Sequence, residues 1–423
     1  MRCFLSIVFI AIFWVSQAQV QRIPIGHTSS SLDSVSSFEL IARIRNYYSA
    51  TTNPADVLNK HIDSPKAAII IEEKNKFYIN SLEGYETLIF SLDSFKQIGI
   101  IRHCFDITDT ALFNEHSALG YPFAFRGDVR IFCGKPVEGC LTHDGKYMWI
   151  TYYRRSFDKS AIQPSAMAII DTDNDSIVRV MATGPLPKMI APSPDGKFLA
   201  VTHWGDNTIG IIDISSNNPD DFQYIDHFVV ENKLSLNSAN NTPYNRDQEC
   251  GFCLRGTVFT PDSRYLLVGR MGGGGIAIFD MDSMAYLGTV WGMKTNVRHL
   301  LIHDDYLYLS ANKPGYVQKA PLDSVISAVY NNGTTWSDWE GVFVGKGART
   351  IDITPDGEFL FVAANNVSKV SMIRTSDMKI VAESVADSYP VGLSVSKNGD
   401  IFIVTSQGRY GGGGNSVMIF RIN

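Results

Sequence analysis

A repeated unit of about 45 residues constrains this 423-residue chain more than any other feature. Its clearest copy begins at Pro187, reads PKMIAPSPDGKFLAVT, and continues with NTIGIIDIS from Asn207. This pattern predicts two strands joined by a tight Asp-Gly turn and then a third strand. Equivalent turns occur at Lys74-Asn75, Asp144-Gly145, Asp262-Ser263, Asp304-Asp305, Asp356-Gly357 and Asn398-Gly399. The chain therefore contains seven related units.

The spacing of these units predicts a ring. From residue 144 onward the turns are 51, 67, 43, 51 and 42 residues apart, and the longest interval contains a polar insertion at residues 232–247. A period near 45 with short strands is typical of propeller blades, which bury their faces only against neighbouring blades. Helical repeats are the alternative, but the units carry hairpin turns and period-2 segments instead of helix caps. We expect an all-β, seven-bladed β-propeller.

The last unit is too short to complete a blade by itself. It runs from Pro390 to Asn423, which is 34 residues and enough for three strands. The segment Phe38–Arg45 (FELIARIR) has apolar residues at alternate positions, 38, 40, 42 and 44. We predict that this N-terminal strand supplies the missing fourth strand, because pairing closes the ring and covers edges that would otherwise recruit other chains.

The first residues read as an export signal. Arg2 precedes an apolar run from Phe4 to Val15, and small residues follow up to Ala18. A membrane anchor is the alternative, but the run is shorter than the about 20 residues needed to span a bilayer. We expect a signal peptide at 1–18, an N-terminal segment with the closing strand at 19–50, and the propeller at 51–423. The mature protein is then secreted or periplasmic, monomeric and without a membrane span.

Five cysteines remain after Cys3, and they are Cys104, Cys133, Cys140, Cys250 and Cys253. Export places them in an oxidising compartment, where an odd count leaves at least one unpaired. Cys250-Gly-Phe-Cys253 has redox spacing, but it lacks a βαβ context, and Leu254 stands where haem attachment needs histidine. We predict a local structural disulfide there, while the pairing of the other cysteines stays open.

Two of the units, PKMIAPSPDGKFLAVTHWGDNTIGIIDIS and ARTIDITPDGEFLFVAANNVSKVSMI, resemble the bacterial YVTN-type β-propeller repeat family. The ending PVGLSVSKNGDIFIVTS is also similar, so the resemblance covers residues 56–423. Residues 104–133 depart from the repeat and are expected to be an insertion between blades 1 and 2. The resemblance implies the fold but not one function, since the superfamily includes lactonases, haem-domain reductases and binding modules.

One blade position repeatedly carries a base. The residue seven before the turn Asp is expected at the channel mouth, and it is Lys188, Arg255, Arg298 or Arg349 in four units. Loops on the same face add Arg270 and His203, and His299 follows Arg298. Four cations about 10 Å apart repel by roughly 2–3 kcal/mol in total. Either acids such as Glu138, Asp206 and Asp352 or a small anionic ligand must offset this repulsion.

Three functions are compatible with these residues. The preferred hypothesis is a non-enzymatic module that binds a small anion on Lys188, Arg255, Arg298, Arg349, Arg270, His203 and His299. A lactonase-like hydrolase with His203 as general base is the second, although no G-x-S-x-G nucleophile motif occurs. The third is a scaffold that binds an envelope protein through Tyr153, Trp204 and Tyr410.

Several partners are not expected. A net charge of −6 provides no general attraction to nucleic acid. His143 precedes an Asp-Gly turn and therefore belongs to the opposite face, which leaves only His203 and His299 as histidine ligands. We accordingly predict neither a metal nor a cofactor.

Overall fold

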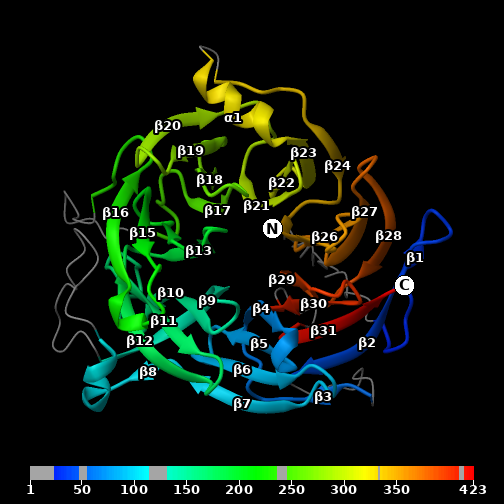
Figure 1. The fold of residues 1–423 in the computed structure, drawn as a ribbon. Helices are drawn as coiled ribbons and strands as arrows, with labels where there is room; N and C mark the ends of the chain where they lie inside the picture. Colours follow the sequence, from blue (N-terminus) through cyan, green and yellow to red (C-terminus); the bar gives the residue numbers. More distant parts are fainter. Residues whose placement is uncertain (1–22, 47–54, 114–130, 236–244, 332–333, 409–413) are drawn as a thin grey trace, which may run out of the picture.

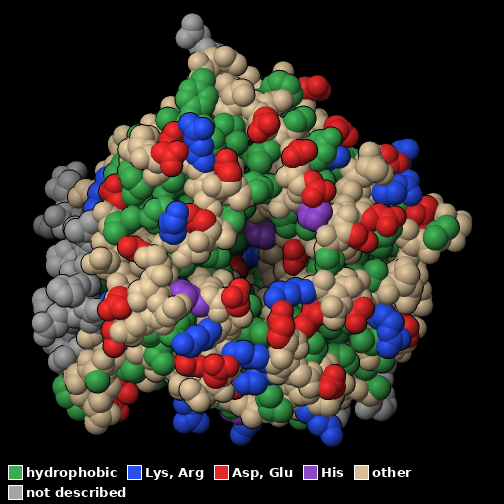
Figure 2. All heavy atoms as spheres, viewed as in Figure 1, with side chains coloured by type: hydrophobic (Ala, Val, Ile, Leu, Met, Phe, Trp, Pro, Cys, Tyr) green, Lys and Arg blue, Asp and Glu red, His purple; other side chains and the backbone are tan. Residues whose placement is uncertain are grey.

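Seven antiparallel sheets are arranged as blades around a central axis, and the chain passes from one blade to the next around the ring (Figure 1). The protein is therefore a seven-bladed β-propeller, as the repeat predicted. This computed structural model describes residues 23–46, 55–113, 131–235, 245–331, 334–408 and 414–423. The predicted signal peptide, residues 1–18, lies outside the described residues. Seen along the axis, the ring is hollow at its centre (Figure 2).

The first four blades each contain four strands in sequence order, counted from the axis outward. Blade 1 is β4 (Pro65–Ile71), β5 (Lys76–Ser81), β6 (Glu86–Ser91) and β7 (Gln97–Arg102). Blade 2 is β9 (Phe132–Thr142), β10 (Tyr147–Arg155), β11 (Ser165–Asp171) and β12 (Ser176–Thr183), with β8 (Cys104–Phe105) added beside β9. Blade 3 is β13 (Pro187–Pro192), β14 (Phe198–His203), β15 (Thr208–Asp213) and β16 (Gln223–Val229). Blade 4 is β17 (Leu254–Phe259), β18 (Tyr265–Arg270), β19 (Ile276–Asp280) and β20 (Ala285–Val290).

The last three blades complete the ring. Blade 5 is β21 (Val297–His303), β22 (Tyr306–Ala311), β23 (Tyr316–Pro321) and β24 (Glu340–Phe343). Blade 6 is β25 (Ala348–Ile353), β26 (Phe359–Ala364), β27 (Lys369–Arg374) and β28 (Lys379–Val385), with β1 (Ser30–Ser31) on its outer edge. Blade 7 is β29 (Pro390–Val395), β30 (Ile401–Ser406), β31 (Ser416–Ile422), β2 (Phe38–Arg45) and β3 (Val57–Leu58).

The predicted turns all join the first and second strands of their blades. Gly196, Gly357 and Gly399 occupy equivalent turn positions and share a φ of 72°, a left-handed conformation that glycine adopts at little cost. Because a hairpin reverses the chain, the turns lie at one end of each sheet. The start of the innermost strand and the loop between the second and third strands lie at the other end. The fold therefore gathers these two segments from successive blades on one face.

The N-terminal strand closes the ring as predicted. β2 pairs antiparallel with β31, from Phe38 opposite Ile422 to Arg45 opposite Ser416. Arg43 bonds to both Asp56 and Asp387, and Arg45 shares Asp56, with all four side chains almost fully buried. This network fixes the closing strand to the last blade and to the segment that leads into the first.

The core consists of apolar layers between neighbouring blades. One cluster joins blades 6 and 7 through Phe361 and Phe402, and another joins blades 1 and 2 through Ile69 and Met148. Each blade therefore buries its faces against its neighbours, which is why the repeat is stable only as a ring.

Three short 3-10 helices, η1 (Glu72–Lys74), η2 (Ile107–Leu112) and η3 (Pro219–Asp221), lie between strands. A single α-helix among the described residues, α1 (Leu322–Tyr330), was not predicted. It joins β23 to β24 and buries Leu322, Val325, Ile326 and Val329. These apolar residues recur at helical spacing, so the signal was present but lay outside the repeat. Among the described helices, none has the length and apolar character required to cross a bilayer.

The predicted local disulfide is present, and a second disulfide links two other cysteines. Cys250 and Cys253 form a disulfide, and a second one joins Cys104 to Cys133. The second bridge holds together the two ends of the insertion at residues 104–133, most of whose interior, residues 114–130, lies outside the described part. Cys140 is free and half-buried, which accounts for the odd cysteine.

Candidate functional site

A cavity of about 330 Å³ lies on the face formed by the strand starts and the second-to-third-strand loops. Its described lining includes six cationic side chains, and these are Lys66, Arg154, Lys188, Arg255, Arg298 and Arg349. The acids Glu83 and Asp247 also line the cavity. Glu138 is not part of the lining but forms an ion pair with Arg255. Glu83 already pairs with Lys135. Because Lys135 neutralises Glu83, the six lining cations face two further acids, Asp247 and Glu138, which leaves an excess of four positive charges.

The structure brings together the four bases predicted at one blade position. Lys188, Arg255, Arg298 and Arg349 lie near the starts of β13, β17, β21 and β25, the innermost strands of four consecutive blades. Their exposed fractions are only 5–9%. Because the register of the innermost strand repeats, the same position in each blade reaches the same cavity. Burial of like charges at such close quarters is costly unless acids or a ligand compensate.

Arg255 has such an acid. Its guanidinium forms an ion pair with Glu138, from β9 of blade 2. Burial raises the pKa of Glu138, but the charges of Arg255, Arg349 and Lys66 outweigh this effect and hold the pKa below its usual value. Glu138 is therefore ionised and neutralises part of the cluster.

Lys188 is held by aromatic rings. Its ammonium lies 3.7 Å from the ring centroid of Tyr153 and 5.2 Å from that of Trp204. Such cation–π contacts contribute about 2 kcal/mol when they are desolvated. Tyr153 and Trp204, predicted as exposed anchors for a protein partner, are both half-buried and form one wall of the cavity. Tyr410, the third predicted anchor, lies outside the described residues.

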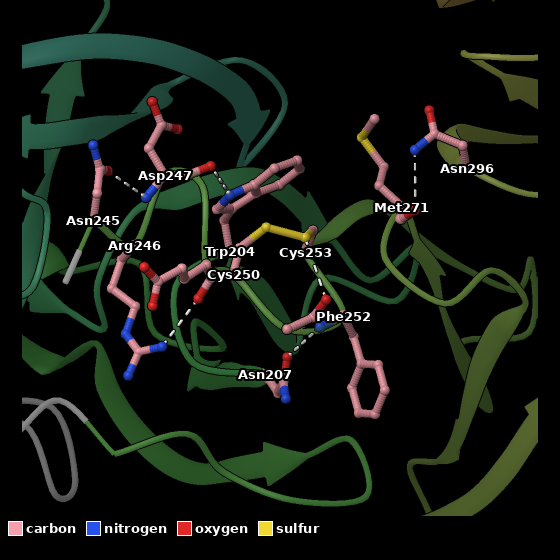
Figure 3. Close-up of a disulfide and its surroundings, with 12 residues drawn as sticks. Trp204, Asn207, Asn245, Arg246, Asp247, Cys250, Phe252, Cys253, Met271 and Asn296 are labelled. Carbon is pink, nitrogen blue, oxygen red and sulfur yellow. Dashed lines mark hydrogen bonds between the residues drawn. A yellow bond between two sulfur atoms is a disulfide. The ribbon is translucent and has the colours of Figure 1, made fainter. Parts of the chain in front are cut away.

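The loop that carries the Cys250–Cys253 disulfide adds Asp247 to this wall (Figure 3). The indole N–H of Trp204 donates to the backbone carbonyl of Asp247 at 3.4 Å. The backbone N–H of Phe252 donates to the side chain of Asn207 at 2.8 Å. These bonds fasten the loop to blade 3 on both sides of Cys250.

Lys66 and Arg349 are bonded to neutral oxygens. The Lys66 ammonium donates to Gln407 Oε1 at 3.2 Å, and Arg349 Nε donates to the Val391 carbonyl at 3.2 Å. Lys66 lies one residue before the equivalent position of blade 1, whereas Gln407 and Asp247 were not predicted. Gln407 lies in a loop after β30 and Asp247 in the insertion, so neither shares a repeat position that would have marked it.

Arg298 differs from Arg255 and Arg349 because its guanidinium has no oxygen partner among the described residues. Its Nη1 lies 3.3 Å from the Met271 sulfur, a weak acceptor. Its Nε is buried without a hydrogen-bond partner in the described structure. Buried guanidinium groups are normally paired, so this side chain has unused donors beside the cavity.

Arg270 does not belong to the cavity, although the sequence predicted it as a ligand-binding residue. Its Nη1 donates to Glu231 at 2.6 Å and to Thr289 at 2.7 Å. The guanidinium carbon also lies 3.7 Å from the ring centroid of Phe252 and 5.0 Å from that of Trp291. The glycine run 272–275 next to it has no residue in the cavity lining either, and the run 411–414 lies mostly outside the described residues. Arg270 therefore stabilises blade 4.

His203, the other predicted loop residue, does not line the cavity either. It is fully buried, its Nε2 accepts the backbone N–H of Gly184 at 3.1 Å, and its Nδ1 bonds to Thr208 at 2.8 Å. Asp206 contacts the same Thr208 hydroxyl, so it orients the imidazole only indirectly. Burial holds the pKa of His203 well below its usual value. A neutral imidazole with both nitrogens engaged is not positioned as a base for a ligand in the cavity.

His299 lies just behind the cavity and does not line it. Its Nδ1 accepts the backbone N–H of Ile351 at 3.0 Å, and burial lowers its pKa to about 4. Its neighbour Arg298 reaches the cavity because successive side chains of a strand point in opposite directions. In the described part of the chain, no three His, Cys, Asp or Glu side chains are grouped as metal ligands would be.

Comparison with known proteins gives the fold and one distant relative. No family model matches the chain. Hydrazine synthase subunit beta of Kuenenia stuttgartiensis is 24% identical over 254 residues, covering 50% of this chain and 60% of that protein. The match therefore spans less than two thirds of the relative.

Two solved structures are similar in fold. Kuenenia stuttgartiensis hydrazine synthase superimposes with a TM-score of 0.53 and 18% identity, over 77% of this chain and 86% of that chain. The Cps50 (Swd1) β-propeller domain of Myceliophteria thermophila superimposes with a TM-score of 0.56 and 10% identity, over 84% and 96%. At identities this low, the structural similarity establishes the propeller fold and does not specify a function.

Proposed function

We propose that this chain is a β-propeller binding module that holds a small anion in the cavity at the channel mouth, in a secreted or periplasmic setting. The observation that carries the proposal is Arg298, a buried guanidinium whose Nε has no partner among the described residues and whose Nη1 contacts only the Met271 sulfur. Unused guanidinium donors next to an excess of positive charge favour carboxylate or phosphate oxygens, which arginine can bind in bidentate fashion. The ligand would supply the acceptors that the protein lacks.

The two alternatives have less support. A lactonase-like reaction would need His203 at the cavity, yet that imidazole is buried in blade 3 and bonded on both nitrogens. A scaffold role would use Tyr153 and Trp204 as exposed anchors, yet both rings contact Lys188. The name of the distant relative describes a subunit of a larger enzyme and does not specify a ligand for this cavity.

The test measures anion binding by the purified chain and its Arg298→Met variant. Isothermal titration with citrate and with inorganic phosphate should give binding to the wild type that weakens by at least about 30-fold in the variant, because truncating a buried charged partner costs about 2–5 kcal/mol of binding. Arg264→Met is the matched control, since that arginine is half-exposed and lies in a turn on the opposite face. Equal affinity in wild type and Arg298→Met, or no binding of either probe, would overturn the proposal.

A further inference from the structure

The cavity has two kinds of cation, and only one kind can change its charge near neutral pH. Arginine stays protonated in proteins, whereas a buried lysine readily loses its proton. Among the described cations of the cavity lining, the lysines are Lys66 and Lys188. The net charge of the cavity therefore depends on the state of these two ammonium groups.

Lys66 faces charged groups from four other blades. Arg349 of β25, Lys188 of β13 and Arg255 of β17 repel its ammonium, and Glu138 of β9 attracts it. Burial, together with the three cations, holds its pKa well below the usual lysine value. Its hydrogen-bond partner, the neutral Gln407 side chain, adds no opposing charge.

Lys188 faces a similar balance. Burial is the largest cause of its lowered pKa, and the cations Arg255, Arg298 and Arg349 lower it further. Asp247, from the disulfide loop, acts in the opposite direction. The rings of Tyr153 and Trp204 complete its surroundings. Without a ligand, these surroundings favour the neutral amine of both lysines. An anion bound among the same groups would favour the protonated ammonium, because it adds negative charge beside it.

We propose that the site selects small anions carrying at least two negative charges and that Lys66 and Lys188 take up protons as such an anion binds. This inference rests on the proposed function. With both lysines protonated, a ligand with one charge leaves most of the excess positive charge of the cavity unbalanced, whereas a di- or tricarboxylate or a phosphate ester balances more of it. The volume of about 330 Å³ is at the lower end for ligand pockets and limits the ligand to a small molecule.

The sign of the pH dependence follows from linkage. Between the lowered pKa of the empty site and the higher pKa of the occupied site, the complex holds more protons than its free components. Affinity is therefore greatest on the acid side of this window and falls as the pH rises through it, by up to tenfold per pH unit for each proton taken up.

The test is a titration of the purified chain with citrate, succinate, acetate and glycerol 3-phosphate. At pH 8.5 it is run in triethanolamine and in Tris, whose ionisation enthalpies differ, so that the heat difference counts protons. We expect citrate and glycerol 3-phosphate to bind at least tenfold more tightly than acetate, with net proton uptake. The uptake should decrease in Lys66→Met and in Lys188→Met and stay unchanged in Lys197→Met, a control at an exposed turn.

The outcomes separate this inference from the proposed function. Binding without proton uptake, or acetate binding as tightly as citrate, would overturn the inference and leave an anion site in place. No binding of any probe would overturn both. Because the proton count is measured on the wild type, it holds even where a lysine variant fails to fold. If citrate and glycerol 3-phosphate differ by more than tenfold, the tighter one identifies the ligand as carboxylate or phosphate.

Discussion

At the residue scale, equivalent positions of consecutive blades carry arginines with opposite energetic roles. Arg255 has the buried carboxylate of Glu138 as its partner, whereas Arg298 has a methionine sulfur. Removing one partner of a buried ion pair leaves an uncompensated charge, whereas removing a buried charge that lacks a compensating partner also removes its desolvation penalty. The repeat makes the two positions look identical, and only their partners distinguish them.

We therefore predict that Arg255→Met and Arg298→Met differ in stability without ligand. Arg298→Met should leave the free energy of unfolding unchanged or raise it. The free energy of unfolding of Arg255→Met should be about 3 kcal/mol lower than that of Arg298→Met, because Glu138 loses its ion-pair partner. Urea denaturation of both variants in Tris chloride, without added carboxylate or phosphate, measures the difference. Equal midpoints and slopes for the two variants would contradict the assigned roles.

The same scale shows what the sequence could predict of the site. The four repeated bases were identified because strand register places one position of every blade at the same distance from the axis. The contacts of Arg270 with Glu231 and of His203 with Thr208 could not be predicted, because Glu231 and Thr208 belong to no repeat position. Polar partners of this kind follow from loop conformation, which a periodic pattern does not determine.

At the scale of elements, segments that depart from the repeat are fixed either by a disulfide or by apolar packing. The Cys104–Cys133 disulfide joins β8 to the start of β9, where the two cysteines face each other in the ladder. The interrupted repeat predicted an insertion at residues 104–133, but spacing alone could not pair its cysteines. Helix α1 was missed for a related reason, since a nine-residue amphipathic segment does not change the repeat count.

Removing this disulfide should destabilise the fold by a measurable amount. The bridge spans 29 residues, and closing such a loop in the unfolded chain is worth about 3–4 kcal/mol. We expect Cys104→Ser/Cys133→Ser to lose about this much free energy of unfolding, measured by urea denaturation. The matched control is Cys250→Ser/Cys253→Ser, which spans three residues and should lose less. A larger loss in the control would show that loop closure does not govern the effect.

At the scale of the whole molecule, the ring depends on one N-terminal strand. β2 covers the edge of β31, and its Phe38 is fully buried in edge-to-face contact with Phe361, Phe402 and Phe420. The sequence predicted this closure because the last unit lacked a strand and residues 38–45 alternated. It did not predict the buried Arg43–Asp56 network, whose partners are 13 residues apart and show no periodicity.

Loss of the closing strand should therefore affect the entire ring. Phe38→Ala should lower the free energy of unfolding by about 3–5 kcal/mol, as for other buried phenylalanines, whereas Val35→Ala, at an 83% exposed position, should change it little. Deleting residues 19–46 should go further and cause aggregation, because β31 then presents an unpaired edge. Size-exclusion chromatography and calorimetry measure both effects. A deletion variant that stays monomeric and melts in one transition would mean that the six other blades and three strands of the seventh suffice, and that β2 covers the ring without holding it closed.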